Sequence, residues 1–467
     1  MRRRCSPRIT LLACLAVYGC VDDPEVSADH DESTDEEPDA ADAHDPADDA
    51  ADRAAPDTQL LDERAFMLEV AGEWPPSGQF EFIGYLRPAG ITEWVHQTAP
   101  AASLAALLAA NDLVRGTPSV TPSESADDVG RGVLLSADGR VFRERTSEVS
   151  ARIAALASMP QFDVVNESTV SQVHAPGSTA ERNDDVPPLP DDRATDRHSE
   201  GGIAGSDDRE LVIGSGSPWR KVGVALLRRN STNIDASTGW RAGGSGAFIG
   251  PRAVLTAAHV VIDDGDDDEP KILAAGPAKR GESWSGETPP PNAAVANEKF
   301  PWGLRRVSWY FWPEDHESGE FRYDYALVIL RDLNWAPGRV GFGYQTTTWL
   351  DYKGYNLAGY PSDDESCKDS PDDDEKCGGY LYKNYGNITA VGKWSGVHYI
   401  DTQPGMSGGP VYELQESIDR RTIYFINVAQ CDTSDCGMAK RLRKGSFRTL
   451  CGWIDVFPSS HFSNVDC

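Results

Sequence analysis

Three short motifs in the C-terminal half constrain the fold of this 467-residue chain more than any other feature. TAAHVV places His259 directly after the strand-like run AFIGPRAVL, and YDYALVIL places Asp324 at the head of an apolar run. DTQPGMSGGPV surrounds Ser407 with glycines on both sides. Because glycines let the backbone turn tightly, the amides of Gly405 and Ser407 can point together at an oxygen anion.

Serine, histidine and aspartate are the residue types of a nucleophilic catalytic triad. The imidazole takes the proton of the serine, and the carboxylate fixes the tautomer of the imidazole. Each motif alone has a structural alternative: a histidine after a strand is usually structural, and an aspartate that opens a strand or a Ser-Gly-Gly-Pro run is usually part of a turn. Three such coincidences in this order favour the catalytic interpretation. We therefore expect His259, Asp324 and Ser407 to be catalytic, and the amides of Gly405 and Ser407 to bind the oxyanion.

The order His, Asp, Ser is similar to that of the two-barrel trypsin-like serine proteases and differs from the orders in subtilisins and α/β-hydrolases. Residues from about 203 to 460 resemble the glutamyl-endopeptidase branch of that family in three places: LAGYPSD at 357–363, IAGSDDR at 203–209, and the pattern from Tyr399 to Pro410. The resemblance implies an all-β fold of two antiparallel six-stranded barrels. It implies that the histidine and aspartate come from the first barrel and the serine from the second.

Met406 precedes the serine, where animal trypsins carry an aspartate. In those enzymes the aspartate pairs with the freshly cut N-terminal ammonium and completes the oxyanion hole. A neutral thioether cannot form this ion pair, so activation by that route is excluded. The glutamyl-endopeptidase branch also lacks the aspartate, and there the new N-terminus helps to bind the substrate carboxylate.

Primary specificity stays open at the sequence level. Asp401 lies six residues before Ser407, where trypsin keeps the carboxylate that binds Arg or Lys. Thr402 is similar to the threonine that reaches an acidic substrate side chain in the glutamyl-endopeptidase branch. The histidine of that branch is replaced by Asn427 in IYFINVAQC. We expect Asp401, Thr402 and Asn427 to contact substrate, with a glutamyl preference and a basic or broader preference as alternatives.

The first 20 residues, MRRRCSPRITLLACLAVYGC, predict an export signal, because a basic stretch precedes an apolar run. Gly19-Cys20 resembles a bacterial lipobox, in which the cysteine is lipidated and becomes the mature N-terminus. Tyr18 departs from that motif. A plain secretory signal is the alternative. We expect an exported protein, either a cell-envelope lipoprotein or secreted, with membrane contact only through a lipid on Cys20.

Residues 21–59 form a strongly acidic segment. From Val21 to Asp57 there are 16 acidic residues and one basic residue, which supply half of the formal net charge of −30. So little apolar surface cannot form a core, and we expect a disordered tether, with acidic metal binding as the alternative. The overall acidity argues against nucleic-acid binding.

Residues 60–175 regain pattern, with strand-like FMLEV, QFEFIGYL and VLLSADGRVF and helix-like ASLAALLAAN and SEVSARIAALASM. They predict a small α+β prodomain. The Pro- and Asp-rich stretch 176–202 predicts a linker that contains the processing site. Every lysine lies at or after Lys221, which independently indicates a boundary near residue 200. The serine protease domain is expected at 203–467.

Three of the nine cysteines lie in the leader, and the other six follow Asp324. An even number in an exported protein predicts three disulfides, for which nearest-neighbour pairing is the simplest hypothesis. Scattered spacings argue against zinc. The acidic runs at 263–269 and 372–375 match no EF-hand, so we expect solvated loops, with calcium as the alternative. We expect no metal or cofactor, and a monomer. The disulfide candidates are Cys367, Cys377, Cys431, Cys436, Cys451 and Cys467.

Together these features predict an exported serine endopeptidase, made as a zymogen, that hydrolyses protein or peptide substrates. The alternative is a catalytically silent module that keeps the fold and binds a partner at the cell envelope. The intact triad argues against the alternative, because binding alone requires none of the three side chains.

Overall fold

The computed structural model describes most of the chain after residue 67, and all of the described residues belong to one compact unit, Ala51–Cys467. The predicted leader with Cys20, the acidic tether, the linker 176–202 and both acidic runs lie outside the described residues. The described residues are 68–86 without 69, 74, 76 and 77, then 103–115, 128–167, 208–229 without 213, 240–262, 273–280, 300–316, 321–331, 337–362 without 352, 379–430 and 436–457.

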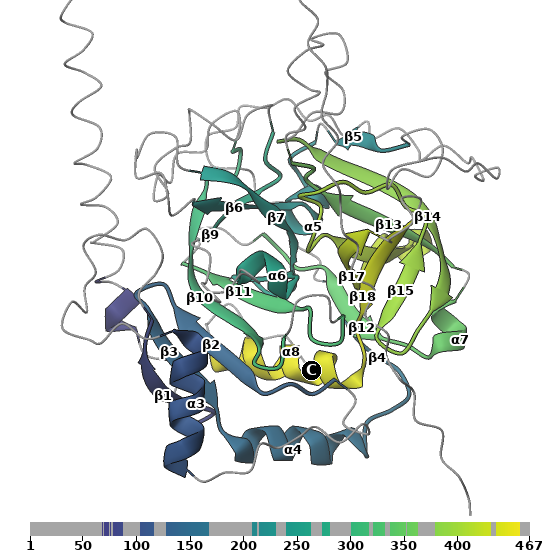
Figure 1. Cartoon of the computed structure of the whole chain (residues 1–467). Helices are drawn as coiled ribbons and strands as arrows, with labels where there is room; N and C mark the ends of the chain where they lie inside the picture. Colours follow the sequence, from purple (N-terminus) through teal and green to yellow (C-terminus); the bar gives the residue numbers. More distant parts are fainter. Residues whose placement is uncertain are drawn as a thin grey trace, which may run out of the picture. The chain divides into compact units, whose positions relative to one another are not determined.

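Six antiparallel strands form the first barrel (Figure 1). β9 pairs with both β6 and β10, which closes the sheet on itself. The short helix α5 (Trp219–Val222) precedes these strands in the chain, and α6 (Ala258–Val261) lies between β8 and β9. The strands are β6 (Val224–Arg229), β7 (Trp240–Phe248), β8 (Ala253–Thr256), β9 (Leu273–Pro277), β10 (Arg305–Pro313) and β11 (Ala326–Leu330).

The second barrel closes in the same way, because β16 pairs with both β13 and β17. Its interior holds an apolar cluster that includes Leu357, Val411 and Phe425. Closure leaves neither barrel with an open sheet edge, and the two barrels confirm the expected all-β, chymotrypsin-like fold class. The strands are β13 (Gly354–Gly359), β14 (Leu381–Val391), β15 (Ser395–His398), β16 (Pro410–Gln415), β17 (Arg420–Gln430) and β18 (Gly437–Arg441).

Further elements attach to the second barrel. β12 (Gly341–Tyr344) pairs in parallel with β17, and β5 (Glu210–Val212) pairs with β14. The C-terminal helix α8 (Lys444–Val456) follows β18 and buries Trp453 and Phe447. α7 (Thr347–Leu350) and the 3-10 helix η3 (Glu416–Ile418) are short connections. No helix within the described residues is long and apolar enough to cross a membrane.

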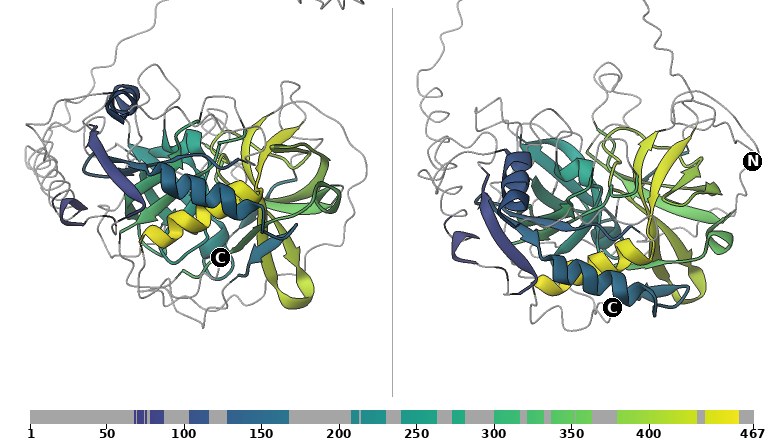
Figure 2. Two further views of the ribbon diagram at one scale, coloured as in Figure 1. Left: turned by 90° about the horizontal axis from the view of Figure 1, so that it is seen from below. Right: turned by 60° about the horizontal axis from the view of Figure 1, so that its bottom comes forward.

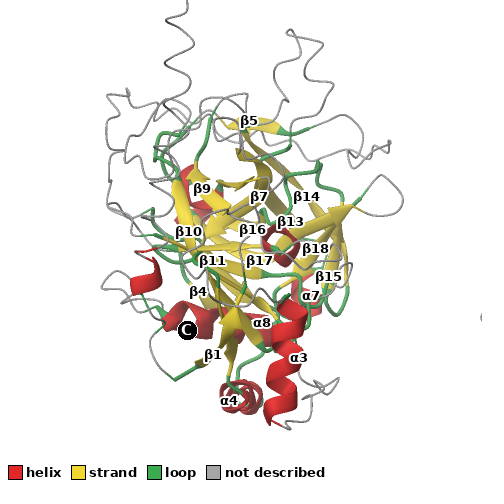
Figure 3. Cartoon of the chain, turned by 60° about the vertical axis from the view of Figure 1, so that its left-hand side comes forward, coloured by secondary structure: helices red, strands yellow, loops and turns green. Residues whose placement is uncertain are grey.

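Residues before the barrels form helices and strands of their own: β1 (Phe80–Tyr85), α3 (Leu104–Arg115), β2 (Gly132–Ser136), β3 (Arg140–Glu144), α4 (Thr146–Leu156) and β4 (Asp163–Val165). β2 and β3 form the expected hairpin, and Gly139 in its turn has a φ of +91°. The predicted strand FMLEV is wrong, because Leu68 and Val70 are helical. Figure 3 shows α3, α4 and α8 gathered on the same side of the strands.

Candidate active site

His259 and Asp324 come together because of the strand register in the first barrel. β8 ends at Thr256 and β11 begins at Ala326, and these two residues pair across the sheet. His259 lies in α6, just after β8, and Asp324 lies two residues before β11, so this pairing brings the two side chains next to each other. Nδ1 of His259 lies 2.9 Å from Oδ2 and 3.1 Å from Oδ1 of Asp324. The structure therefore brings two of the expected catalytic side chains into direct contact.

Asp324 is 6% exposed, and it also accepts hydrogen bonds from two backbone amides. The amides of Ala258 and His259 donate to its Oδ1 at 2.8 and 3.2 Å. Burial raises the pKa of Asp324, but the charge and hydrogen bonds of His259 outweigh burial, so the pKa lies below its ordinary value. The ionised carboxylate can only accept, so Nδ1 of His259 carries the proton and Nε2 is left as a base.

Ser407 lies in a tight turn immediately before β16. Gly408, the next residue, has a φ of +83°, which L side chains rarely adopt. A Cβ atom at Gly408 would lie 3.1 Å from the amide nitrogen of Ala257, so the turn packs against the segment that leads into His259. The three expected catalytic residues therefore come from adjacent segments of the two barrels.

The amides of Gly405 and Ser407 donate to no acceptor within the described residues. Gly405 has a φ of +91°, which turns the chain back before the serine. Between these two residues the side chain of Met406 is fully buried in the apolar cluster of the second barrel. An apolar side chain in an apolar cluster explains why no charged residue is found at this position.

Ser245 of β7 joins the first barrel to the serine turn, and no sequence motif singles it out. Its amide donates to the carbonyl of Ser407 at 2.7 Å, and its hydroxyl donates to the carbonyl of Gly405 at 2.9 Å. The same hydroxyl accepts a hydrogen bond from the amide of Tyr360 at 2.8 Å. The available signal is the run Gly-Gly-Ser-Gly, because a Cβ at Gly244 would lie only 3.1 Å from the Ser407 carbonyl.

Asn427 of β17 anchors the serine turn from the second barrel. Its amide donates to the carbonyl of Gly409 at 2.9 Å, and its carbonyl accepts from the amide of Gly408 at 2.7 Å. Its side-chain Nδ2 donates to the carbonyl of Met406 at 3.1 Å. The side chain is 3% exposed. Three hydrogen bonds thus fix the turn that carries Ser407.

His398 of β15 lies buried next to Asn427. Its Nδ1 accepts a hydrogen bond from the amide of Ile400, so its Nε2 carries the proton and donates to Oδ1 of Asn427, both at 3.3 Å. Burial lowers the pKa of His398 to about 4, although its hydrogen bonds act in the opposite direction. This histidine is therefore neutral at neutral pH. A single histidine in a short strand gives no sequence signal of such a role.

Asp401 and Thr402 are buried, with 2% and 1% of their surface exposed. Oδ2 of Asp401 accepts a hydrogen bond from the amide of Asp208 at 2.8 Å. The next residue, Arg209, donates to Oε1 of Gln403 at 2.9 Å. The segment that leads into β5 therefore lies against the positions at which the sequence predicts substrate contacts.

Cys436 and Cys451 are the two cysteines among the described residues, and both are disulfide-bonded. The other four disulfide candidates and Cys20 lie outside the described residues, so the pairing stays a prediction. Within the described part of the chain no group of three or more His, Cys, Asp or Glu residues could hold a metal ion.

Part of this chain is similar in sequence to a known protease. The chain is 27% identical over 217 residues to glutamyl endopeptidase from Bacillus licheniformis. The match covers 46% of this chain and 56% of that protein, so the chain spans little more than half the length of this curated relative. No protein-family model matches the chain.

A solved structure of a Glu endopeptidase in complex with MPD also matches, at 15% identity and a TM-score of 0.39. The match covers 56% of this chain and 99% of the solved one. The sequence similarity and the two closed barrels confirm the resemblance to trypsin-like serine proteases and to their glutamyl-endopeptidase branch.

Proposed function

We propose that this chain, a homologue of glutamyl endopeptidase with the two-barrel fold of chymotrypsin-like serine proteases, is an exported serine endopeptidase. The observation that carries the proposal is the hydrogen-bonded pair of His259 and Asp324, with the Ser407 turn packed against the segment that leads into His259. Its substrates are proteins or peptides, and it acts as a monomer.

In the proposed mechanism, Oγ of Ser407 attacks the carbonyl carbon of the scissile peptide bond while Nε2 of His259 takes the hydroxyl proton. Asp324 stabilises the imidazolium that forms, since its carboxylate stays ionised. The amides of Gly405 and Ser407 donate to the developing oxyanion. The imidazolium then gives its proton to the leaving amine, and water hydrolyses the acyl-enzyme with His259 as the base.

Glutamate is the proposed primary preference. The relative is named for cleavage at glutamyl residues, and two contacts support the same choice. The carboxylate of Asp401 is buried and accepts a hydrogen bond from the backbone amide of Asp208. It is therefore not presented to a basic substrate side chain in the way that the trypsin carboxylate is. Arg209, which is also buried and donates to Gln403, adds a fixed positive charge to this region, and a positive charge there favours an acidic substrate side chain.

Maturation is proposed to follow cleavage between residues 176 and 212, so that the active form begins near Ile203. Glu200-Gly201 is a suitable self-cleavage bond for a glutamate-directed enzyme. Because Met406 is buried in an apolar cluster, the new terminus acts on the specificity pocket and not through a trypsin-like ion pair. Export and lipidation at Cys20, or simple secretion, belong to the same proposal.

The experiment is mass spectrometry of peptides formed when the purified protein is incubated with a mixed peptide library. We expect new ends that follow glutamate far more often than other residues. Peptide ends that follow Arg or Lys would contradict the proposed glutamate preference and show a basic one, but they would still show that the protein is an endopeptidase. If no peptide is cut at any pH from mildly acidic to basic, the silent binding module becomes the better account.

A further inference from the structure

The segment 128–167, here named the N-terminal clamp, adds a strand to the sheet of each barrel. β2 pairs antiparallel with β10 of the first barrel, from Trp309 opposite Ser136 to Pro313 opposite Gly132. β4 pairs with β12, which itself pairs with β17 of the second barrel. Between the two, α4 packs against α8, and Figure 2 shows the two helices lying together. One continuous segment is therefore hydrogen-bonded to both halves of the protein.

Asp128 is the central contact of the clamp, and it is fully buried. Its Oδ2 accepts a hydrogen bond from Nζ of Lys440 at 2.8 Å, and neither side chain is exposed. Its Oδ1 accepts from the amide of Ser446, in the first turn of α8, at 3.0 Å. Asp128 also has a φ of 54°, which is uncommon for a residue other than glycine and is retained where the surrounding contacts fix it.

The same residue reaches the catalytic region. The hydroxyl of Tyr325 donates to the carbonyl of Asp128 at 3.3 Å, and Tyr325 directly follows Asp324 in the chain. The Tyr325 ring stacks on Trp453 of α8, with centroids 5.7 Å apart. The clamp therefore contacts the residue that directly follows Asp324.

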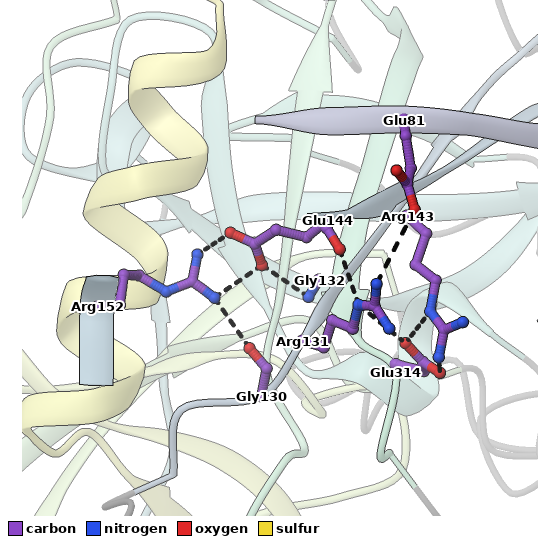
Figure 4. Close-up of polar contacts among 8 residues, drawn as sticks. All are labelled: Glu81, Gly130, Arg131, Gly132, Arg143, Glu144, Arg152 and Glu314. Carbon is purple, nitrogen blue, oxygen red and sulfur yellow. Dashed lines mark hydrogen bonds and ion pairs between the residues drawn. The ribbon is translucent and has the colours of Figure 1, made fainter. Parts of the chain in front are cut away.

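Ion pairs extend the contact along the first barrel (Figure 4). Arg143 of β3 binds both carboxylate oxygens of Glu314, the residue after β10, and its Nε lies 2.7 Å from Oε2. Glu144 is held inside the clamp by Arg152 and by the amide of Gly132 at 2.9 Å. Bidentate arginine–carboxylate pairs of this kind fix the relative orientation of the two side chains and also add stability.

Glu167 closes the other end of the clamp. It forms an ion pair with Lys221 of α5 and lies 3.5 Å from a guanidinium nitrogen of Arg421 in β17. The side chains of Glu167, Lys221 and Arg421 are each less than 10% exposed. This carboxylate thus contacts β17 of the second barrel and the helix that leads into the first. Removal of the clamp would take the carboxylate away from buried Lys221, whereas Arg421 would keep its ion pair with Asp419.

Apolar burial follows the same surface. All five residues of β2 are buried, and so are all five of β3. Phe142 packs on Trp309 of β10 with ring centroids 5.9 Å apart. Phe80 of β1, the strand that pairs with β3 of the clamp, packs on Phe311 at 5.7 Å. Aromatic side chains of this size contribute strongly to cores and interfaces. Loss of the clamp would therefore expose a face of β10 that is built as protein interior.

We propose that the N-terminal clamp is a permanent part of the folded protein, so that cleavage in the linker 176–202 yields two chains that stay bound, and not a released prodomain. The contacts above lie either within residues 80–167 or between these residues and residues after 208, so a cut in the linker breaks none of them. The proposal rests on the proposed function only in taking linker cleavage as part of maturation.

The test places a recognition sequence for a site-specific protease within 176–202 of the full chain, in a Ser407→Ala background that cannot cut itself. After cleavage, size-exclusion chromatography and native mass spectrometry in non-denaturing buffer should give one species that contains both fragments in equal amounts. Addition of denaturant should separate them. Because this background is catalytically silent, a failure of the proposed protease activity does not affect the result.

Two variants and a control identify the contact that holds the clamp. Asparagine tolerates a positive φ as aspartate does, so Asp128→Asn keeps the backbone conformation and the side-chain oxygen that accepts from the amide of Ser446. The variant leaves Lys440 buried without its counter-ion. It should release the N-terminal fragment at least about 100-fold faster than the parent, because breaking one half of a buried pair costs about 3 kcal/mol or more, at 1.4 kcal/mol per tenfold. Adding Lys440→Met should restore much of the retention. Arg145→Gln, an exposed charge of the same clamp, should change release by less than about twofold.

Separation of the parent fragments in non-denaturing buffer would overturn the proposal and identify residues 60–175 as a releasable prodomain. Equal release from Asp128→Asn and Arg145→Gln would overturn the assignment of Asp128 as the central contact.

Discussion

Acid should destabilise this protein through one buried side chain, His398. Its pKa is about 4 in the folded protein, because burial disfavours the charged ring, against an ordinary value of 6.5. Between these two values the unfolded chain binds a proton that the folded chain does not. The free energy of unfolding should therefore fall as the pH falls from 6.5 to 4, and this group should add no further loss below pH 4. At 1.36 kcal/mol per pKa unit the full effect is about 3 kcal/mol.

The assay is urea unfolding of the Ser407→Ala protein, followed by intrinsic fluorescence at a series of pH values, beside the same protein with His398→Gln. Glutamine keeps an amide donor near Asn427 but does not titrate. The difference in unfolding free energy between the two proteins should change by about 3 kcal/mol between pH 7 and pH 4, with the histidine protein losing more. If the two pH profiles run parallel, the account of His398 as a neutral buried donor to Asn427 is wrong.

Further predictions concern catalysis, the serine turn and the two ends of maturation. Asp324→Asn should lower kcat by about 10⁴-fold with little change in melting temperature, because an amide no longer holds the required tautomer of His259, as steady-state peptide hydrolysis would measure. Asn427→Ala should lower kcat by more than it raises KM, because it frees the carbonyl of Met406 and loosens the turn; an unchanged kcat would contradict this. Cys20→Ser should lose the tag after metabolic labelling with a fatty-acid analogue, and equal labelling of both proteins would exclude the lipobox. N-terminal sequencing of active enzyme should find a protease chain that begins near Ile203, beside the N-terminal fragment that stays bound to it, and full activity of an uncleavable precursor would contradict that expectation.

The fold and the candidate triad could be predicted because each signal is local. His259 directly follows a strand, Asp324 directly precedes one, and Ser407 lies in a glycine-rich turn. Strand pairing then needs only to bring the ends of β8 and β11 together, which the antiparallel register does. His398 carries no such signal, and Ser245 carries only the weak one of the glycines around it, since the roles of both depend on neighbours that the chain brings close only after both barrels form.

The N-terminal clamp could not be predicted for a related reason. The sequence indicated the β2–β3 hairpin, but the pairing of Leu134 with Phe311 joins residues far apart in the chain. One signal was available in VLLS: a continuous apolar run is typical of a strand covered on both faces, and β2 is buried at every position. The prediction of a strand at FMLEV is wrong because a short apolar run does not distinguish strand from helix.

Active-site labelling tests the central claim most directly. The mature protein is treated with a fluorophosphonate probe, digested, and mapped by mass spectrometry, with Ser407→Ala and His259→Ala as matched variants. The account predicts a single modified residue, Ser407, with no labelling of the first variant and labelling slowed on the order of 10³-fold or more in the second. Absence of labelling in the intact protein, or modification of another residue while Ser407 stays unmodified, would contradict it.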